Sequence, residues 1–261
     1  MITFLKKDTV MFTHKNNTYL QIDTAKIYYE ELGDKSKDVL LFLHGGLGTI
    51  EDLGEIAKDF INDYRIIGID SRGHGASTLG KNKLSYELIE NDIYAILDYL
   101  NIKKVSIIGF SDGGIVGLRM ASSNKIKVEK LVSIASSWSL DEQQKDIYKS
   151  LTAEEMKNIF SKEYDLYQKL NSEANFELLS KELIKMWIDE SSSGYPNENV
   201  KNISAKTLLI RGDNDFLTSL NSFEVLQSKL SECSILNIPF AEHEVYKEEK
   251  EIVVSYIKRF F

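Results

Sequence analysis

The fold of this chain is decided by residues 105–114, which read Val105-Ser106-Ile107-Ile108-Gly109-Phe110-Ser111-Asp112-Gly113-Gly114. The first four residues form an apolar, β-branched run that is typical of a buried strand, and a helical pattern begins at Ile115. A Gly-x-Ser-x-Gly sequence between a strand and a helix predicts a nucleophile elbow, a sharp turn that holds the serine in strained backbone geometry. The alternative is a glycine-rich turn with an ordinary serine. The strand-turn-helix context favours the elbow, with Ser111 projecting from the end of the sheet.

Other short apolar runs recur along the chain and alternate with helical patterns. Nearly continuous apolar strands are typical of a parallel sheet that is covered on both faces. The alternation therefore predicts an α/β fold, with a mostly parallel central sheet and helices on both faces. Residues 10–33 alternate in polarity and predict an antiparallel hairpin at the sheet edge. The expected strands of the main sheet span residues 39–43, 66–69, 105–108, 131–134, 207–210 and 234–238.

The stretch from Ser139 to Asn202 breaks this rhythm. It has no strand-like run, and its apolar residues recur at helical spacing among many charges. We interpret it as a helical cap inserted between two strands. The expected division is a core of residues 1–138 and 203–261 and a cap of residues 139–202.

Composition excludes several classes of protein. The 261 residues are 43% hydrophobic, enough to bury a full core, and 40 acidic against 32 basic residues give a net charge of -8. That charge disfavours a nucleic-acid partner, and no apolar run approaches the roughly 18 residues that span a membrane. The single Cys233 excludes an internal disulfide and a cysteine-rich zinc site. The apolar run Val10–Phe12 is too short for a signal-peptide core, so we expect a cytoplasmic protein. We also expect the partner to be a small-molecule substrate. Composition does not predict the oligomeric state.

Two later segments carry the residue types that a serine nucleophile requires. A serine at neutral pH needs a base, and a histidine base needs a carboxylate to fix its tautomer. Arg211-Gly212-Asp213-Asn214-Asp215 follows the strand at 207–210, and Ala241-Glu242-His243 follows the strand at 234–238. The carboxyl ends of parallel strands are where such sheets gather their sites. Spacing alone leaves both Asp213 and Asp215 open as the carboxylate.

A third segment, His44-Gly45-Gly46-Leu47-Gly48, follows the strand at 39–43. Glycines there leave backbone N–H groups free to point at a developing oxyanion, although they could equally serve only a tight turn. We expect the side chain of His44 to hold neighbouring loops together.

The remaining histidines do not indicate a metal site. His14 precedes the predicted fold and is expected to be exposed, and His74 lies in the loop Arg72-Gly73-His74-Gly75. The four histidines lack metal-ligand spacing. Gly73-x-Gly75 lacks the third glycine of a dinucleotide-binding loop. We therefore expect neither a metal nor a cofactor.

Taken together, these segments resemble the α/β-hydrolase superfamily. The resemblance covers about residues 15–135 and 203–261 and rests on residues 42–46, 68–77, 109–113 and 212–215 and on His243. Thr218 stands where many relatives carry proline, and Glu242 where a small residue is common. We expect neither of these two side chains to touch the catalytic residues.

The resemblance implies a catalytic triad of Ser111 as nucleophile, His243 as base and Asp215 as the carboxylate, with Asp213 as the alternative. It also implies that the backbone N–H groups of Gly46 and Asp112 form the oxyanion hole. The implied activity is that of a serine hydrolase, or esterase, acting on a small ester or related acyl substrate. The alternatives are a C–C bond hydrolase of the same fold and a non-enzymatic ligand-sensing or signalling protein.

The side chain of Asp112 has two possible roles. A carboxylate at a helix N-terminus is favourable by about 0.3–1 kcal/mol. Beside a nucleophile it would also repel anionic substrates and favour a cationic group, a substrate-binding role. The elbow resembles that of the biphenyl-hydrolase-like group, which includes hydrolases of amino-acid esters.

Overall fold

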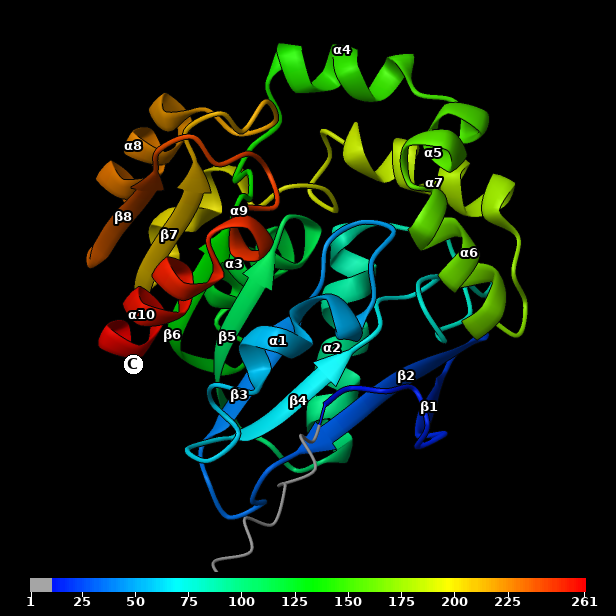
Figure 1. Cartoon of the computed structure of the whole chain (residues 1–261), viewed down its shortest axis with the longest axis horizontal. Coiled ribbons are helices and arrows are strands. Elements are labelled where there is room, and N and C mark those ends of the chain that lie inside the picture. The colour runs from blue at the N-terminus through cyan, green and yellow to red at the C-terminus, as the bar shows by residue number, and fades with distance from the viewer. Residues whose placement is uncertain (1–10) are drawn as a thin grey trace, which may run out of the picture.

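The computed structural model describes residues 11–261 and contains one eight-stranded sheet (Figure 1). Residues 1–10 lie outside the described residues. They include the start of the expected core, of the expected edge hairpin and of the N-terminal apolar run. The strand order is β1-β2-β4-β3-β5-β6-β7-β8. The strands are β1 (Tyr19–Ile22), β2 (Ala25–Leu32), β3 (Val39–Leu43), β4 (Arg65–Ile69), β5 (Lys104–Phe110), β6 (Lys127–Ile134), β7 (Lys206–Gly212) and β8 (Cys233–Ile238).

The sheet is mixed but mostly parallel. Strands β3 to β8 pair in parallel, whereas β1 pairs with β2, and β2 with β4, in antiparallel fashion. The predicted α/β fold is confirmed, and β1 and β2 form the expected edge hairpin. Leu43 of β3 lies opposite Gly109 of β5, so the segments that follow these two strands emerge side by side.

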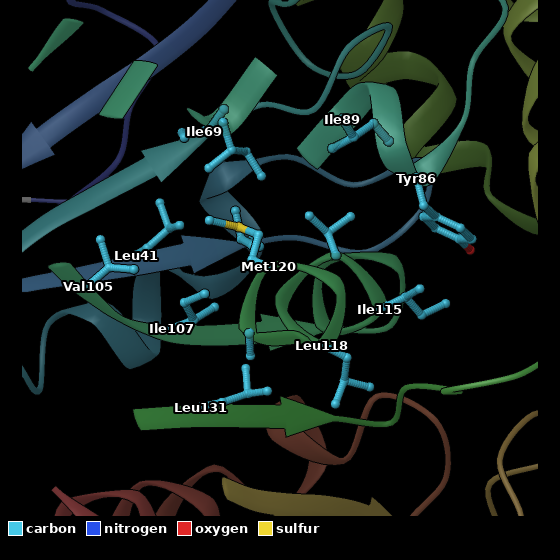
Figure 2. Close-up of a cluster of buried hydrophobic side chains, with 14 of the residues drawn as sticks. Leu41, Ile69, Tyr86, Ile89, Val105, Ile107, Ile115, Leu118, Met120 and Leu131 are labelled. Atoms are coloured by element: carbon cyan, nitrogen blue, oxygen red, sulfur yellow. The ribbon is translucent and has the colours of Figure 1, made fainter. Parts of the chain in front are cut away.

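Helices cover both faces of the sheet, and a separate apolar core lies on each face. Figure 2 shows the first core, where Ile115, Leu118 and Met120 of the helix after β5 lie among strand side chains such as Leu41 and Leu131. Burying one such aliphatic side chain contributes about 1.5–3 kcal/mol. This first face carries α2 (Tyr86–Tyr99), α3 (Asp112–Ser123) and α8 (Leu220–Lys229), and the second carries η1 (Ile50–Leu53), α1 (Gly54–Ala57), α9 (Val245–Glu248) and α10 (Lys250–Phe260).

A helical insertion separates β6 from β7, and Figure 1 shows it across the carboxyl ends of the parallel strands. Side-chain caps define its helices: Asp141 and Thr152 each form a capping box, and Asn175 accepts from the amide of Leu178. The segment contains no strand, as its sequence predicts. It comprises α4 (Glu142–Ser150), α5 (Ala153–Ile159), α6 (Ser161–Leu170), α7 (Phe176–Trp187) and η2 (Asn197–Asn202).

None of the helices within residues 11–261 is both long enough and apolar enough to cross a membrane.

The expectation that His14 is exposed is wrong. Its side chain is only 2% exposed, with Nε2 at 2.7 Å from the buried carboxylate of Asp70 and Nδ1 at 2.7 Å from Glu51. The imidazole also stacks on Tyr28, with ring centroids 5.0 Å apart. Burial lowers the pKa of His14, but the hydrogen bonds and charges of Asp70 and Glu51 outweigh burial and raise the pKa to about 9. The side chain of His14 is therefore a buried cation, and its ion pair with Asp70 links the chain before β1 to the residue that follows β4.

We predict that His14→Gln lowers the free energy of unfolding by about 1–2 kcal/mol at pH 6. A histidine whose pKa is raised in the folded state stabilises fully below its unfolded pKa of about 6.5. That contribution is lost as the pH rises through the folded value of about 9. The difference between wild type and variant in urea denaturation should therefore shrink between pH 6 and about pH 10. An equal difference at both pH values would contradict a charged His14.

Candidate active site

Ser111 lies on a strained turn between β5 and α3. Its backbone has φ 49° and ψ -119°, a conformation that residues with side chains rarely adopt. The turn requires glycine on either side: a Cβ added to Gly109 would lie 2.4 Å from the carbonyl oxygen of Gly113, and one added to Gly113 would lie 2.2 Å from that of Leu43. The sharp turn predicted from Gly-x-Ser-x-Gly is therefore present.

His243 and Asp215 reach Ser111 from the loops after β8 and β7. The distance from His243 Nε2 to Ser111 Oγ is 3.1 Å, and His243 Nδ1 lies 3.0 Å from each carboxylate oxygen of Asp215. Asp213 is engaged elsewhere, because its carboxylate accepts from the amide of Phe240 at 2.5 Å. Of the two aspartates that the sequence leaves open, Asp215 is the one within hydrogen-bond distance of His243.

Asp215 is held by further donors from its own turn. It accepts from the amides of Leu217 and Thr218 at 2.9 and 3.2 Å and from the Thr218 hydroxyl at 2.5 Å. The expectation that Thr218 does not touch the triad candidates is wrong, since the turn after Asp215 folds back and brings the hydroxyl onto the carboxylate. Burial raises the pKa of Asp215, but the bonds from His243, Thr218 and Leu217 and the charge of His243 outweigh burial and lower the pKa below its usual value.

Two aromatic rings flank the imidazole of His243. The ring centroid of Phe110 lies 5.2 Å away and that of Phe216 lies 6.2 Å away. Phe216 is 62% exposed, whereas Phe110 is buried. The imidazole thus packs between two aromatic rings while its nitrogens face Ser111 and Asp215.

The loop of Gly46 lies close to the nucleophile turn because β3 and β5 are paired in register. A Cβ added to Gly45 would lie 3.2 Å from the Cβ of Ser111, and one added to Gly46 would lie 2.8 Å from the carboxylate of Asp112. Within the described chain, neither the amide of Gly46 nor that of Asp112 donates to a protein acceptor, and the amide of Asp112 is the first of α3. His44 fixes the loop that carries Gly46: its Nδ1 lies 2.7 Å from the carbonyl oxygen of Gly45, and its Nε2 accepts from the amide of Ser71 at 2.9 Å. Two unpaired N–H groups next to a serine hydroxyl can stabilise an oxyanion.

The carboxylate of Asp112 is buried and already has protein donors. The Tyr86 hydroxyl donates to Oδ1 at 2.7 Å, and the indole N–H of Trp187 lies 2.9 and 3.1 Å from the two oxygens. Burial is the largest effect and raises the pKa of Asp112, although both donors act to lower it. Sequence reasoning did not find this network, because Trp187 lies in the insertion, 75 residues away. The network accounts for the buried carboxylate without a substrate cation.

The residues between 11 and 261 include no group of three or more His, Cys, Asp or Glu side chains that could hold a metal ion. His74 is fully enclosed next to His44, with ring centroids 5.3 Å apart. Burial lowers the pKa of His74 to about 4, so this ring stays neutral near pH 7.

Comparison with known proteins agrees with this architecture. Residues 38–162 match the alpha/beta hydrolase fold family. A predicted esterase/lipase of Haemophilus influenzae is 30% identical over 85% of this chain and 82% of its own. The esterase YbfF of Escherichia coli is 33% identical over 36% of this chain and 37% of its own. A meta-cleavage product hydrolase of Pseudomonas fluorescens has the same fold, with a TM-score of 0.76 at 18% identity over 91% of this chain and 94% of its own. This chain belongs to the alpha/beta hydrolase fold superfamily.

Proposed function

We propose that this protein is a serine hydrolase that cleaves a small ester or related acyl substrate through an acyl-enzyme. The observation that carries the proposal is the chain of contacts from Ser111 Oγ to His243 Nε2 at 3.1 Å and from His243 Nδ1 to Asp215 at 3.0 Å. A nucleophile, its base and a carboxylate that orients the base are the parts of this mechanism. The similarity to the Haemophilus influenzae esterase/lipase also supports an esterase-like activity.

The proposed reaction has two steps. Ser111 gives its proton to His243 and attacks the substrate carbonyl, while Asp215 fixes the imidazole tautomer and stabilises the cation that forms. The amides of Gly46 and Asp112 donate to the oxyanion. His243 then protonates the departing alcohol, which leaves an ester on Ser111. Water, deprotonated by His243, attacks that ester. The bond from the acyl group to Ser111 Oγ then breaks, His243 returns the proton to Oγ, and the acid is released.

The buried charge of Asp112 must be reconciled with this mechanism, because a carboxylate one residue from the nucleophile opposes an oxyanion. Hydrogen bonds from the hydroxyl of Tyr86 and the indole of Trp187 stabilise this charge and draw it toward themselves. A donor in an oxyanion hole contributes about 3–4 kcal/mol to transition-state stability. In the proposed mechanism the two amides oppose the unfavourable effect of the Asp112 charge on the oxyanion.

We predict that Ser111→Ala lowers kcat for p-nitrophenyl acetate by more than about a thousandfold, because the nucleophile is lost. A fluorophosphonate probe should label the wild type on Ser111 and leave the variant unlabelled. Ser228→Ala, a change at an exposed serine of α8, serves as the control and should keep full activity. Variant activity above about one-tenth of wild type would exclude Ser111 as the nucleophile. A wild type that turns over no ester and takes no label would favour the ligand-sensing alternative, and turnover of a dienoic C–C substrate alone would favour the C–C hydrolase.

We predict that Asp215→Asn lowers kcat by about 10³- to 10⁴-fold, since an amide cannot hold His243 in the required tautomer. Asp213→Asn is the matched control, two residues away and bonded to Phe240 instead. It should change kcat by less than about threefold. The assignment of Asp215 fails if Asp213→Asn is the more damaging change.

We predict that Asp112→Asn changes kcat/KM for an amino-acid ester and for p-nitrophenyl acetate by the same factor, within about threefold. The reason is that Tyr86 and Trp187 already occupy the carboxylate. A loss of about tenfold confined to the amino-acid ester would instead indicate that Asp112 binds the substrate cation.

A further inference from the structure

The indole ring of Trp187 lies beside the nucleophile turn, next to Asp112 and Gly46. Trp187 is the last residue of α7, and its side chain reaches down from the insertion to the nucleophile turn. A Cβ added to Gly46 would lie 2.8 Å from Cζ2 of the indole and 2.8 Å from the carboxylate of Asp112. The six-membered part of the indole therefore packs directly against the residue whose amide faces the oxyanion.

The position of this ring is fixed by contacts on several sides. Its N–H donates to Asp112, and the ring of Tyr148 lies 5.2 Å away at 36°. The backbone carbonyl of Trp187 accepts from the Tyr195 hydroxyl at 2.9 Å. Trp187 is only 8% exposed, so the ring cannot swing aside without breaking a buried hydrogen bond.

The chemistry of acyl transfer relates this ring to the substrate. The departing alcohol must lie toward His243, which protonates it, and the carbonyl oxygen must lie toward the amides of Gly46 and Asp112. The remaining substituent, the acyl chain, then extends away from His243. In the proposed arrangement it meets the indole of Trp187, which packs against both residues whose amides would hold the carbonyl oxygen. A well-packed aromatic ring does not yield to extra methylene groups without strain.

We propose that Trp187 sets the acyl-chain limit of this enzyme, so that its substrates are esters of short acyl groups, from acetyl to butyryl. The proposal rests on the proposed hydrolase function and names the substrate class of that same site. Asp112 acts as the positioning residue, because its carboxylate holds the indole N–H and thereby keeps the ring against Gly46.

The test is a chain-length series of p-nitrophenyl acetate, butyrate and octanoate. We expect the wild type to prefer acetate over octanoate by about a hundredfold in kcat/KM. Trp187→Leu and the milder Trp187→Phe both remove the atoms nearest Gly46, and each should reduce that preference by about tenfold, mainly by accelerating octanoate. Trp138→Phe is the control, since the other tryptophan of the chain donates to the carbonyl of Ser222 instead. It should keep the wild-type ratio within about twofold.

Asp112 is tested by its effect on the same ratio. Asp112→Ala releases the indole and should also reduce the preference for acetate over octanoate. Asp112→Asn keeps an acceptor oxygen for the indole N–H and should retain the wild-type preference. Circular dichroism shows which variants are folded. If Trp187→Leu is unfolded, the acetate-to-octanoate ratio of Trp187→Phe tests the proposal.

The proposal is overturned if folded Trp187 variants still hydrolyse acetate with the wild-type ratio, and the proposed hydrolase function then stands. The proposal is also overturned if the wild type has the same kcat/KM for octanoate as for acetate. A wild type that cleaves no ester and is not labelled on Ser111 overturns the hydrolase function, and the chain-length limit with it. The rates at which methyl and octyl phosphonates label Ser111 distinguish failure of the chain-length limit from failure of the hydrolase function. Labelling depends on the length of the chain but does not require turnover.

Discussion

The close approach of three backbone segments around Ser111 is the constraint on which the rest of the site depends. The end of β5, the start of α3 and the end of β3 pass so near one another that a single Cβ at Gly109 or Gly113 would collide with a carbonyl oxygen. This packing forces Ser111 into its left-handed conformation. It also places the first amides of α3 beside the loop of Gly46. Strain at one residue is offset by the packing of α3 against the sheet.

The parallel sheet supplies the other groups, because each strand ends at the same edge. Strands β7 and β8 pair so that the loops of Asp215 and His243 leave the sheet together, and β6 lies between them and β5. The orientation of His243 is then fixed locally. Asp215 is held by its own turn through Leu217 and Thr218, so its carboxylate is already directed at the imidazole. Preorganisation of this kind lowers the cost of reaching the transition state.

The insertion is linked to the nucleophile turn by a buried charge. The carboxylate of Asp112 receives bonds from Tyr86 in the core and from Trp187 in α7. Because a buried carboxylate without donors would be costly, the helices above the sheet are tied to the residue next to Ser111. The same bonds that satisfy Asp112 also hold the indole of Trp187 against Gly46, so one side chain couples the charge beside Ser111 to the position of that ring.

The sequence alone determined the strands, the strained turn at Ser111, the helical insertion and the chain order of serine, aspartate and histidine. These features depend on local spacing: apolar runs, glycines at fixed offsets and helical periodicity. Only the tertiary structure decided that His14 is buried between Glu51 and Asp70, that Thr218 bonds Asp215, and that Trp187 reaches Asp112. The bonds of His14 and Trp187 join residues tens of positions apart, and that of Thr218 depends on a turn that residue types do not specify. These contacts depend on how the elements pack against one another, and no periodic pattern in the sequence predicts them.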